Sequence, residues 1–551
     1  MKNELTFCPL GGSGEIGMNM NLYAYGNDNE KKWIIVDMGV TFADDSMPGI
    51  DLIYPDPGFI TDKKDDLLGI VLTHAHEDHI GSIVHIWPLL KCKIFATPFT
   101  AVLINEKFKE KKIDIKNYLQ IVQLNQKITL GPFDIDFVTL THSILEPNGL
   151  SISTPLGTVL HTGDWKVDPN PLIGGNIDSE KLKSIGKKGV IAMICDSTNV
   201  FSPGRSGSEL SVRESLLKIV ENKKKRIIVT SFASNVARME TIFYCAKKTN
   251  RNISLVGRSM NRIYKAAKQC GYLSNLIEPV DPRDANKISR DKIIYLCTGS
   301  QGEPMGAMNR IINDVHPDVF MEAGDTVIFS SKMIPGNEKK LYGLQNQIVK
   351  KDIEVITEEN AFVHVSGHPN REDLKDMYNW VKPNCVIPVH GEYRHMKEHI
   401  SFAKEMQVPH TLQVENGDII LIEKLKSKII DKAPTGKMYL DGTVGVPADS
   451  NSIKERKNLS LNGYLEITLI ISNTGKVIKP IISLKGIPQN GEFENFVFDI
   501  EEEITNICKS FSLNNKKQEK NLIETLKSNC RKIVRSKTGK KPFTNINIAR
   551  L

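Results

Sequence analysis

Short apolar runs bounded by glycine or charged residues recur through roughly the first 200 positions, and they predict β-strands. Leu22–Tyr25, Trp33–Val36 and Gly69–Leu72 are three of these runs. From about 207 to 355 the pattern changes to apolar runs separated by helix-length segments, which is typical of a parallel α/β sheet. Around 434–458 the residues turn to Pro, Gly, Asp, Ser and Lys, and we predict a linker there, followed by a small α+β unit.

The composition limits the class of protein. Hydrophobic residues make up 40% and charged residues 25% of the 551 positions, which excludes a disordered chain, a collagen and a small disulfide scaffold. The nine cysteines are scattered singly without a CxxC pair, so neither a disulfide framework nor a cysteine zinc site is expected. Apolar stretches fall short of the roughly 20 residues that cross a bilayer, and charges interrupt the N-terminal windows that could form a signal-peptide core. We expect a cytoplasmic protein without a membrane segment.

The basic residues are concentrated near the C-terminus. The net charge is +7 overall, but residues 516–551 contain eleven Lys or Arg against two Glu, so that residues 1–515 carry a net charge of −2. This basic segment is either a solvated helix face with a basic tail or a surface for a polyanion such as nucleic acid.

A glycine-rich segment near the N-terminus fits the GxGxxG pattern. Its glycines are Gly12, Gly14 and Gly17, and Asp37 lies twenty residues beyond the last of them. Dinucleotide binding requires the third glycine to open a helix. Residues 18–25 instead alternate polar and apolar side chains like a strand, so a turn between two antiparallel strands explains the pattern better.

Three histidines and one aspartate occur within six residues, directly after the apolar run at 69–72. They are His74, His76, Asp78 and His79. Neutral imidazole and carboxylate are ligands that Zn²⁺ or Mn²⁺ accepts. On a turn, His74 and His76 can reach one ion while Asp78 and His79 reach a second.

Three further candidate ligands stand at the ends of apolar runs: His142, Asp164 and His390. If Asp164 bridges two ions, each ion has about three protein ligands and a position left for water, which distinguishes a catalytic site from a structural one. Two ions about 3.5–4 Å apart can activate water and stabilise both oxygens of a phosphoryl transfer. Other histidines are interpreted as structural or surface groups: His85, His161, His316, His395, His399 and His410.

The HxHxDH motif with these distal partners resembles the metallo-β-lactamase superfamily, whose fold is an αββα sandwich. Asp164 and His390 are 226 positions apart, and the segment 207–355 between them resembles the domain inserted in the β-CASP group, which acts on nucleic acids. Signature residues of that group match Asp196, His368 and His390. Within the group, the bacterial ribonuclease J family is similar at residues 11–19, 73–81, 231–235, 298–304, 364–368 and 538–543.

The resemblance implies an α/β protein of three domains. A metallo-β-lactamase core is expected in two parts, 1–206 and 356–448, with a parallel α/β β-CASP domain inserted at 207–355 and a small α+β C-terminal domain at 455–551. RNA is expected to pass between the core and the insert, because the metal ligands and the phosphate donors converge there.

The resemblance also implies an activity, that of a two-metal ribonuclease in rRNA processing and mRNA decay. It would degrade RNA from the 5′ end, preferring a 5′-monophosphate, and also cut internally. Zinc is the expected ion, with manganese or magnesium as alternatives. The catalytic residues would be Asp78, Asp196 and His368, with His368 protonating the leaving oxygen. The RNA 5′ phosphate is expected at Ala233, Ser234, Asn235, His364, Val365, Ser366, Gly367 and His368.

Further expectations come from the resemblance alone. Some family members hold a calcium ion at positions that match Gly49, Asp51 and Asp441, although a structural turn aspartate explains Asp441 equally well. Homodimers or homotetramers are expected through the C-terminal domain. RNA is the expected substrate, and other RNA-decay proteins are candidate partners.

Three other functions stay open at this point. A β-CASP DNA nuclease would share all of the metal chemistry, and only competition between RNA and DNA would separate the two. A small-molecule metallo-hydrolase would need neither the insert nor the segment His364–His368. A catalytically silent scaffold would be expected to lack ligands, yet every ligand position is filled.

Overall fold

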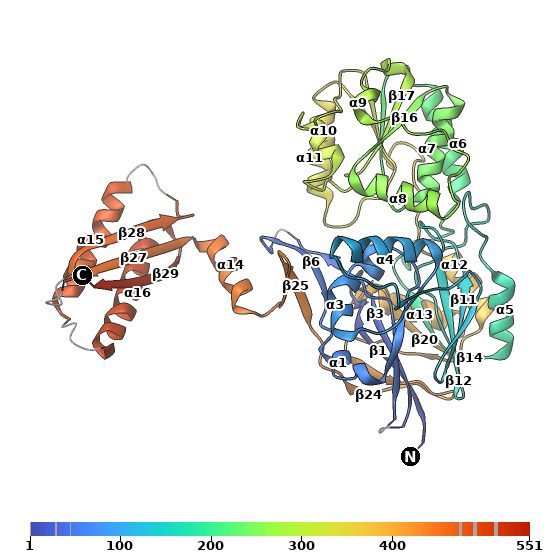
Figure 1. Ribbon diagram of the computed structural model, residues 1–551, viewed down its shortest axis with the longest axis horizontal. Coiled ribbons are helices and arrows are strands. Elements are labelled where there is room, and N and C mark those ends of the chain that lie inside the picture. The colour runs from blue at the N-terminus through green and yellow to red at the C-terminus, as the bar shows by residue number, and fades with distance from the viewer. Residues whose placement is uncertain are drawn as a thin grey trace. The chain divides into compact units, whose positions relative to one another are not determined.

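The computed structural model describes residues 2–27, 30–44, 46–472, 477–488, 493–511 and 516–550. The chain forms two compact units, one of residues 1–41 with 54–436 and the other of residues 42–53 with 437–551 (Figure 1). Within the described ranges, no helix is both long enough and apolar enough to cross a membrane. All nine cysteines are free.

Two large sheets pack face to face in the first unit, and buried side chains such as Phe7, Ile34, Phe137 and Ile387 fill the space between them. One sheet has the order β24 (Lys428–Lys432), β23 (Asp418–Leu421), β1 (Glu4–Gly11), β3 (Met20–Gly26), β4 (Lys32–Val36), β7 (Leu67–Val71), β8 (Ile94–Ala96) and β9 (Leu119–Ile121). The other has the order β10 (Lys127–Leu130), β11 (Phe133–Thr139), β12 (Asn148–Thr154), β13 (Gly157–His161), β14 (Val190–Asp196), β20 (Cys385–Val389) and β22 (His410–Thr411).

Helices cover the outer faces of both sheets (Figure 1). α3 (Ile83–Leu90) and α4 (Pro98–Glu110) lie on the side of the first sheet. On the second sheet, the packed helices are α5 (Ser179–Lys188), α12 (Arg371–Val381) and α13 (Tyr393–Glu405). Leu182, Tyr378 and Phe402 from these helices form one buried cluster with strand residues such as Met193 and Val386. The αββα sandwich is therefore confirmed.

The glycine-rich segment after β1 is a turn, as predicted. β1 and β3 pair antiparallel, with Phe7 opposite Tyr23. Gly12, Gly14 and Gly17 have φ of 87°, 83° and 98°, a region that side chains with a Cβ rarely adopt. The same segment contains the short strand β2 (Ser13–Gly14), which pairs with β21 (Gly391–Glu392) and brings the turn beside His390.

The inserted segment forms a five-stranded parallel sheet. Its order is β16 (Asn252–Val256), β17 (Ile293–Cys297), β15 (Ile227–Thr230), β18 (Thr326–Phe329) and β19 (Glu354–Ile356). The surrounding helices include α6 (Glu209–Glu221), α7 (Val236–Lys248), α8 (Arg258–Gln269), α10 (Ala307–Ile312) and α11 (Glu338–Val349). The carboxyl ends of parallel strands share one edge, which is where ligands bind in such sheets. The loop Ser231–Asn235 and residues after β18 lie at this edge.

The second unit contains two small sheets. One has the order β26 (Val444–Pro447), β25 (Lys437–Asp441), β6 (Ile50–Pro55) and β5 (Thr41–Phe42). The other has the order β28 (Val477–Lys485), β27 (Tyr464–Ile471) and β29 (Phe543–Arg550), and packs against α15 (Phe493–Lys509) and α16 (Lys516–Thr538). The boundary between the two units, at 436/437, falls within the linker predicted at 434–458, but the expectation of an irregular segment was wrong, because these residues form β25, β26 and much of α14 (Asn451–Asn462). β25 pairs with a strand nearly 400 positions away, which local composition does not reveal.

Candidate metal centre

Of the first four candidate ligands, His74 and His76 lie on the loop that follows β7, and Asp78 and His79 lie on the short helix α2 (Glu77–Ile80). Asp37, the fully buried residue after β4, anchors this loop. Its Oδ1 accepts a hydrogen bond from the Thr73 backbone N–H (2.8 Å), and its Oδ2 accepts one from Thr73 Oγ1 (2.7 Å). The loop is thus fixed at Thr73, immediately before His74.

The carboxylate of Asp164 lies at the centre of the histidine cluster and is 2% exposed. Its Oδ2 is 3.2 Å from Nε2 of His79 and 3.5 Å from Nε2 of His390. The same oxygen is 3.7 Å from Nε2 of His142 and 3.8 Å from Nε2 of His74. Asp164 Oδ1 is buried without a hydrogen-bond partner among the described residues. A buried carboxylate oxygen without a donor costs free energy, and a bound cation would remove that cost.

The structure brings together all seven residues predicted as metal ligands, in two sets that share Asp164. The sets are His74, His76 and His142 with Asp164, and Asp78, His79 and His390 with Asp164. The ligand atoms within each set all lie within 4.8 Å of one another. The binding of metal by these residues stays a prediction, and the set composition matches the two-ion arrangement expected from the sequence.

Each histidine of the two sets has one ring nitrogen beside a second partner, which leaves the other nitrogen directed at the cluster. The pairs are His74 Nδ1 with Thr73 Oγ1 (3.0 Å), His76 Nε2 with Ser234 Oγ (3.1 Å), His79 Nδ1 with Asp37 Oδ2 (2.7 Å), His142 Nδ1 with Gly367 O (2.5 Å) and His390 Nδ1 with Asn19 Oδ1 (3.1 Å). Partners of this kind fix the tautomer and ring orientation of metal-binding histidines. The donor set therefore fits divalent metal ions.

Electrostatics also favour metal binding. Burial lowers the pKa of His74 and His142 well below the usual range and that of His76 to about 4. These rings are therefore neutral at pH 7, the form that coordinates a cation. Burial opposes ionisation of Asp164, but the neighbouring histidines, His390 first, hold its pKa well below the usual range.

His390 has an unusual backbone conformation for a residue other than glycine. It follows β20 with φ of 51°, and its backbone N–H donates to Gly12 O at 2.6 Å. Such conformations cost free energy and persist where the surrounding structure enforces them, often at functional sites. The glycine-rich turn thus positions a candidate metal ligand.

A second polar pair lies beside the cluster. His368 Nδ1 is 2.8 Å from Asp196 Oδ2 and 3.9 Å from Asp164 Oδ2. Burial lowers the pKa of His368, but Asp196 and Asp164 outweigh it and raise the pKa to about 9. His368 is therefore protonated at pH 7 in the absence of a cation, as a proton donor must be.

Sequence reasoning missed two residues that contact the candidate ligands. Asp37 was considered only with the GxGxxG pattern, yet it bonds both Thr73 and His79. Asn19 lies within hydrogen-bond distance of His79 Nε2 (3.1 Å) and His390 Nδ1 (2.9 Å). The sequence shows only that Asp37 is a polar residue at the end of a buried strand, and the pairing of β4 with β7 that brings it to the motif is seen in the structure.

Asp37→Asn should weaken metal binding by about 10–100-fold, because it removes the carboxylate that orients His79. Competition with a chelator would measure the affinity for zinc. Asp136→Asn is a matched control, since Asp136 lies on β11, away from the candidate ligands, and forms an ion pair with Lys181. Wild-type zinc affinity in Asp37→Asn would show that Asp37 supports the loop without affecting the ligand set.

The residues predicted to bind the RNA 5′ phosphate lie on two segments of the first unit. Ser234 contacts His76, and the His364 Nδ1 is buried with no partner in the part of the chain that the structure describes. Asn235 uses its amide internally: Oδ1 accepts from the Arg238 backbone N–H (2.9 Å) and Nδ2 donates to Glu209 (3.3 Å).

The remaining predicted phosphate contacts differ in accessibility. Ser366 Oγ accepts from Asn199 Nδ2 (2.6 Å) and from the His368 backbone N–H (3.1 Å). Val365 is 5% exposed, and the Gly367 carbonyl is taken by His142. Ala233 is half-buried on the loop after β15. Among these eight residues, His364 Nδ1 is the one buried side-chain polar atom without a hydrogen-bond partner in the described part of the chain, and phosphate binding by them stays a prediction.

The residues of the predicted calcium site lie in the second unit. The Asp441 carboxylate forms a two-bond ion pair with Arg456, at 2.9 and 2.6 Å. A Cβ built on Gly49 would be 3.3 Å from the same guanidinium, and Asp51 is exposed on β6. Calcium binding stays a prediction, and it requires Arg456 to release Asp441.

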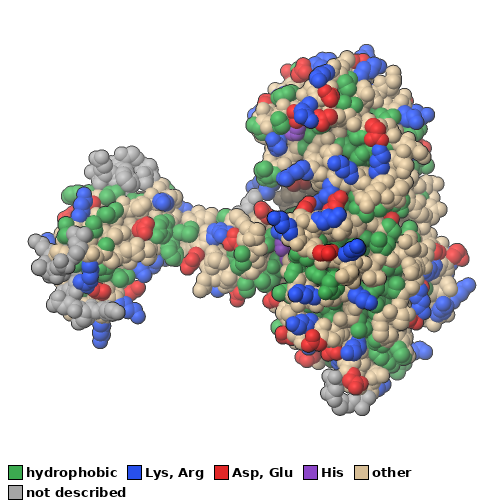
Figure 2. Space-filling model, in the orientation of Figure 1, with side chains coloured by type: hydrophobic (Ala, Val, Ile, Leu, Met, Phe, Trp, Pro, Cys, Tyr) green, Lys and Arg blue, Asp and Glu red, His purple; other side chains and the backbone are tan. Residues whose placement is uncertain are grey.

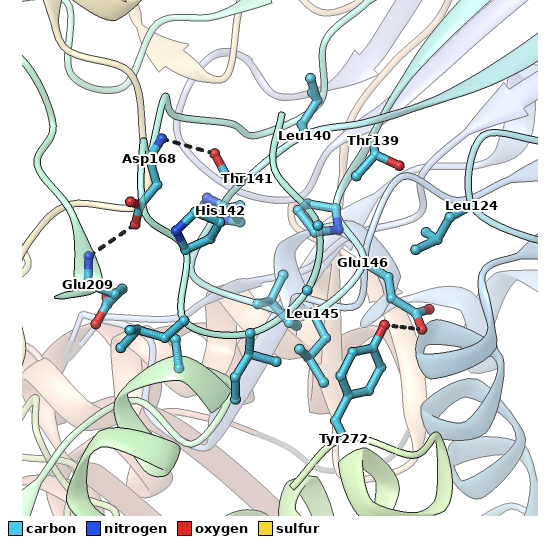
Figure 3. Close-up of a pocket in the computed structure, with 18 residues that line it drawn as sticks. Leu124, Thr139, Leu140, Thr141, His142, Leu145, Glu146, Asp168, Glu209 and Tyr272 are labelled. Atoms are coloured by element: carbon cyan, nitrogen blue, oxygen red, sulfur yellow. Dashed lines mark hydrogen bonds between the residues drawn. The ribbon is translucent and has the colours of Figure 1, made fainter. Parts of the chain in front are cut away.

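A cavity of about 30 Å³ lies beside His142 (Figure 3). Its lining includes core residues 139–142 and 144–147 and residues of the inserted segment such as Glu209 and Tyr272. The Tyr272 hydroxyl donates to Glu146 Oε1 (3.1 Å) across it. Since one water needs roughly 10–15 Å³ of such space, the cavity has room for about two water molecules and not for a nucleotide.

Family models match four successive parts of the chain. The model described as "Metallo-beta-lactamase superfamily" matches residues 19–231, and "Ribonuclease J, beta-CASP domain" matches 224–348. The descriptions "Zn-dependent metallo-hydrolase RNA specificity domain" and "Ribonuclease J C-terminal domain" apply to residues 337–411 and 451–551.

Ribonuclease J proteins of two bacteria are similar to this chain over most of its length. A ribonuclease J of Sinorhizobium meliloti is 37% identical and covers 100% of this chain and 98% of its own. Ribonuclease J 1 of Streptococcus pyogenes is 35% identical, covering 86% of this chain and 85% of its own. A crystal structure of a protein of unknown function from Enterococcus faecalis shares the fold, with a TM-score of 0.52, 16% identity, and coverage of 76% of this chain and 100% of that one. The chain belongs to the ribonuclease J family of the metallo-β-lactamase superfamily.

Proposed function

We propose that the protein is a metal-dependent ribonuclease that hydrolyses RNA phosphodiesters from the 5′ end, prefers a 5′-monophosphate and also cuts internally. The observation that carries this proposal is the position of Asp164 between two sets of histidines, beside the His368–Asp196 pair. Family membership and the match to an RNA specificity domain support RNA as the substrate.

We assign the two sets of residues that share Asp164 as the ligands of two divalent ions, with zinc proposed and manganese or magnesium as alternatives. Bound ions of this kind lower the pKa of water and neutralise charge on the phosphoryl oxygens. Asp37 and Asn19 hold the rings of His79 and His390 in place for this role.

His368 is assigned the role of general acid. Its Nδ1 faces Asp196 at 2.8 Å, so Nε2 is the nitrogen free to give a proton to the leaving oxygen. Asp196 fixes the ring and stabilises its protonated form. The pair lies next to the two ligand sets, since His368 Nδ1 is 3.9 Å from Oδ2 of the shared residue Asp164.

We assign a separate role to each domain expected from the sequence. The core at 1–206 and 356–448 supplies the ligands and the acid, the insert at 207–355 supplies Ser234, and the domain at 455–551 supports assembly into homodimers or homotetramers. The 3.1 Å contact between Ser234 and His76 supports RNA binding between core and insert.

Competition between RNA and DNA of one sequence, both with a 5′-monophosphate, tests the substrate. At fixed salt, RNA should be hydrolysed and unlabelled DNA should inhibit only weakly. Equal hydrolysis of both would favour a β-CASP DNA nuclease. Hydrolysis of neither, with turnover of a thioester or lactone, would favour a small-molecule hydrolase.

The basic face of α16 should contribute to RNA affinity. Lys517, Lys520, Lys532 and Arg535 are exposed and have no ion-pair partner within the described ranges, and Figure 2 shows basic side chains on the visible face of this unit. Replacing all four with Gln should weaken RNA binding and reduce the salt slope by about 0.7 per lost phosphate contact. Binding titrations at several salt concentrations would measure it.

The control for this variant is the pair Lys187→Gln and Lys188→Gln on α5, which should leave the slope unchanged. Metal content should match the wild type in both variants. The α16 variant could instead keep the wild-type salt slope of RNA binding while its activity depends on protein concentration. That result would assign the C-terminal domain to oligomerisation alone.

A further inference from the structure

Arg238 is a fully buried arginine on α7 that takes no part in the metal cluster. Its guanidinium donates to both carboxylate oxygens of Glu209, with distances of 3.0 to 3.2 Å. It also donates to Ser330 O (2.8 Å), Ser330 Oγ (2.6 Å) and Val363 O (2.9 Å). One side chain therefore joins the start of α6, the loop after β18 and the residue that precedes His364.

The same network continues into the core domain. Asp168 Oδ2 accepts from the Glu209 backbone N–H (3.0 Å), and the Asp168 backbone N–H donates to Thr141 Oγ1 (3.2 Å), as the dashed lines in Figure 3 show. Lys166 Nζ lies 3.4 Å from Asp168 Oδ2. The backbone N–H of Lys166 donates to Thr141 O (2.7 Å). Thr141 is the residue before the candidate ligand His142. We call Lys166, Asp168, Glu209 and Arg238 the buried relay.

The buried relay has two positive and two negative side chains, all between 0% and 3% exposed. Desolvation of such groups offsets most of their attraction, so apolar side chains would join two domains at least as stably. Buried ion pairs do restrict geometry, because any shift leaves a charge without its partner. The relay is therefore suited to fix the position of the insert relative to the core.

Both segments predicted to contact the RNA 5′ phosphate are attached to this relay. Arg238 binds Val363 O, beside the His364 ring whose Nδ1 lacks a partner within the described residues. Glu209 and the Arg238 backbone bind Asn235, beside Ser234, whose Oγ is 3.1 Å from His76. The relay thus connects the candidate phosphate donors to the strand end that carries His142.

We propose that Asp168, Glu209 and Arg238 are positioning residues for 5′-end recognition. They hold Ser234 and His364 at a fixed distance from the metal ligands, so that the terminal phosphate and the first phosphodiester are engaged together. This inference rests on the proposed function and adds to it the residues that couple end recognition to cleavage.

Glu209→Gln tests the inference, because it keeps the size of the side chain and removes the charge that pairs with Arg238. Its kcat/KM on 5′-monophosphate RNA should fall by about 10–100-fold, as expected for misplacement of a binding group, with the larger change in KM. Its preference for 5′-monophosphate over 5′-hydroxyl RNA should fall with it. Cleavage of a circular RNA of the same sequence, which has no 5′ end, should stay within about twofold of the wild type, with metal content unchanged.

Asp168→Asn provides an independent variant, because Asp168 lies in the core and touches neither phosphate segment. It should reproduce the selective loss on 5′-monophosphate RNA. Asp325→Asn is the matched control, since Asp325 is a fully buried carboxylate that forms ion pairs with Arg226 and Arg290. Asp325 directly precedes β18 and therefore lies at the opposite edge of the same sheet. Its 5′ preference should equal that of the wild type.

Equal losses on linear and circular RNA in both relay variants would overturn the inference, because they would indicate a general structural role. An unshifted 5′ preference in both variants, with RNA still cleaved, would overturn the inference alone. Wild-type protein that cleaves no RNA would overturn the proposed function, and this inference with it.

Discussion

Asp164→Ala should reduce RNA hydrolysis by about 10³-fold or more, because several kcal/mol of charge stabilisation depend on ions that this carboxylate helps to hold. Asp164 Oδ2 lies within 3.8 Å of four histidine nitrogens, so its removal affects both ligand sets. Metal analysis of the purified variant should show loss of both ions. RNA binding at equilibrium should change little, since no proposed phosphate donor is removed.

Asp78→Ala gives a graded comparison, because Asp78 belongs to only one of the two sets. It should lose one ion and most activity while the other ion remains. Asp136→Ala on the surface of β11 should keep both ions and full turnover. Near-normal turnover of Asp164→Ala with two ions bound would contradict the assignment of Asp164 as the shared ligand.

His368→Ala should lower the chemical rate by about 10²–10⁴-fold without loss of metal, as expected for removal of a general acid. Because an acid must be protonated to act, the wild-type rate should fall as the pH rises through the pKa of His368. This decline should be absent from the variant. Single-turnover rates across pH would measure both effects.

The leaving group provides the control for His368. A substrate whose leaving group needs no proton should lose much less rate in His368→Ala than RNA does. Asp196→Asn should follow the same substrate dependence with a smaller loss, because Asp196 acts through His368 at 2.8 Å. Equal losses on both substrates would assign His368 to phosphate binding.

The sequence was sufficient to predict much of the site, because its ligands follow strand ends and the HxHxDH spacing is local. The seven candidate ligands come together in the structure, although 226 positions separate Asp164 from His390. Asp37 and Asn19 could not be assigned from the sequence, since their contacts depend on strand pairing and on side-chain direction. The αββα sandwich followed from resemblance rather than from periodicity.

Other features depended on contacts between distant segments. The predicted linker contains β25, which lies beside β6 of the N-terminal region. Asn235 was expected to donate to the phosphate, since an asparagine amide can do so. In the structure its side-chain amide instead bonds the Arg238 backbone N–H and the Glu209 carboxylate at the start of α7. The buried relay contains no sequence motif, because its four charged residues come from two domains.

The most direct test of the account uses one labelled RNA with a 5′-monophosphate, a 5′-triphosphate or a 5′-hydroxyl, incubated with chelator-treated protein before and after zinc is restored. The account predicts no hydrolysis before zinc is added. After zinc, the 5′-monophosphate RNA should be degraded fastest, with nucleotides released from its 5′ end. Equal rates on the three RNAs, or full activity in the chelated protein, would contradict a metal-dependent ribonuclease that recognises the 5′ end.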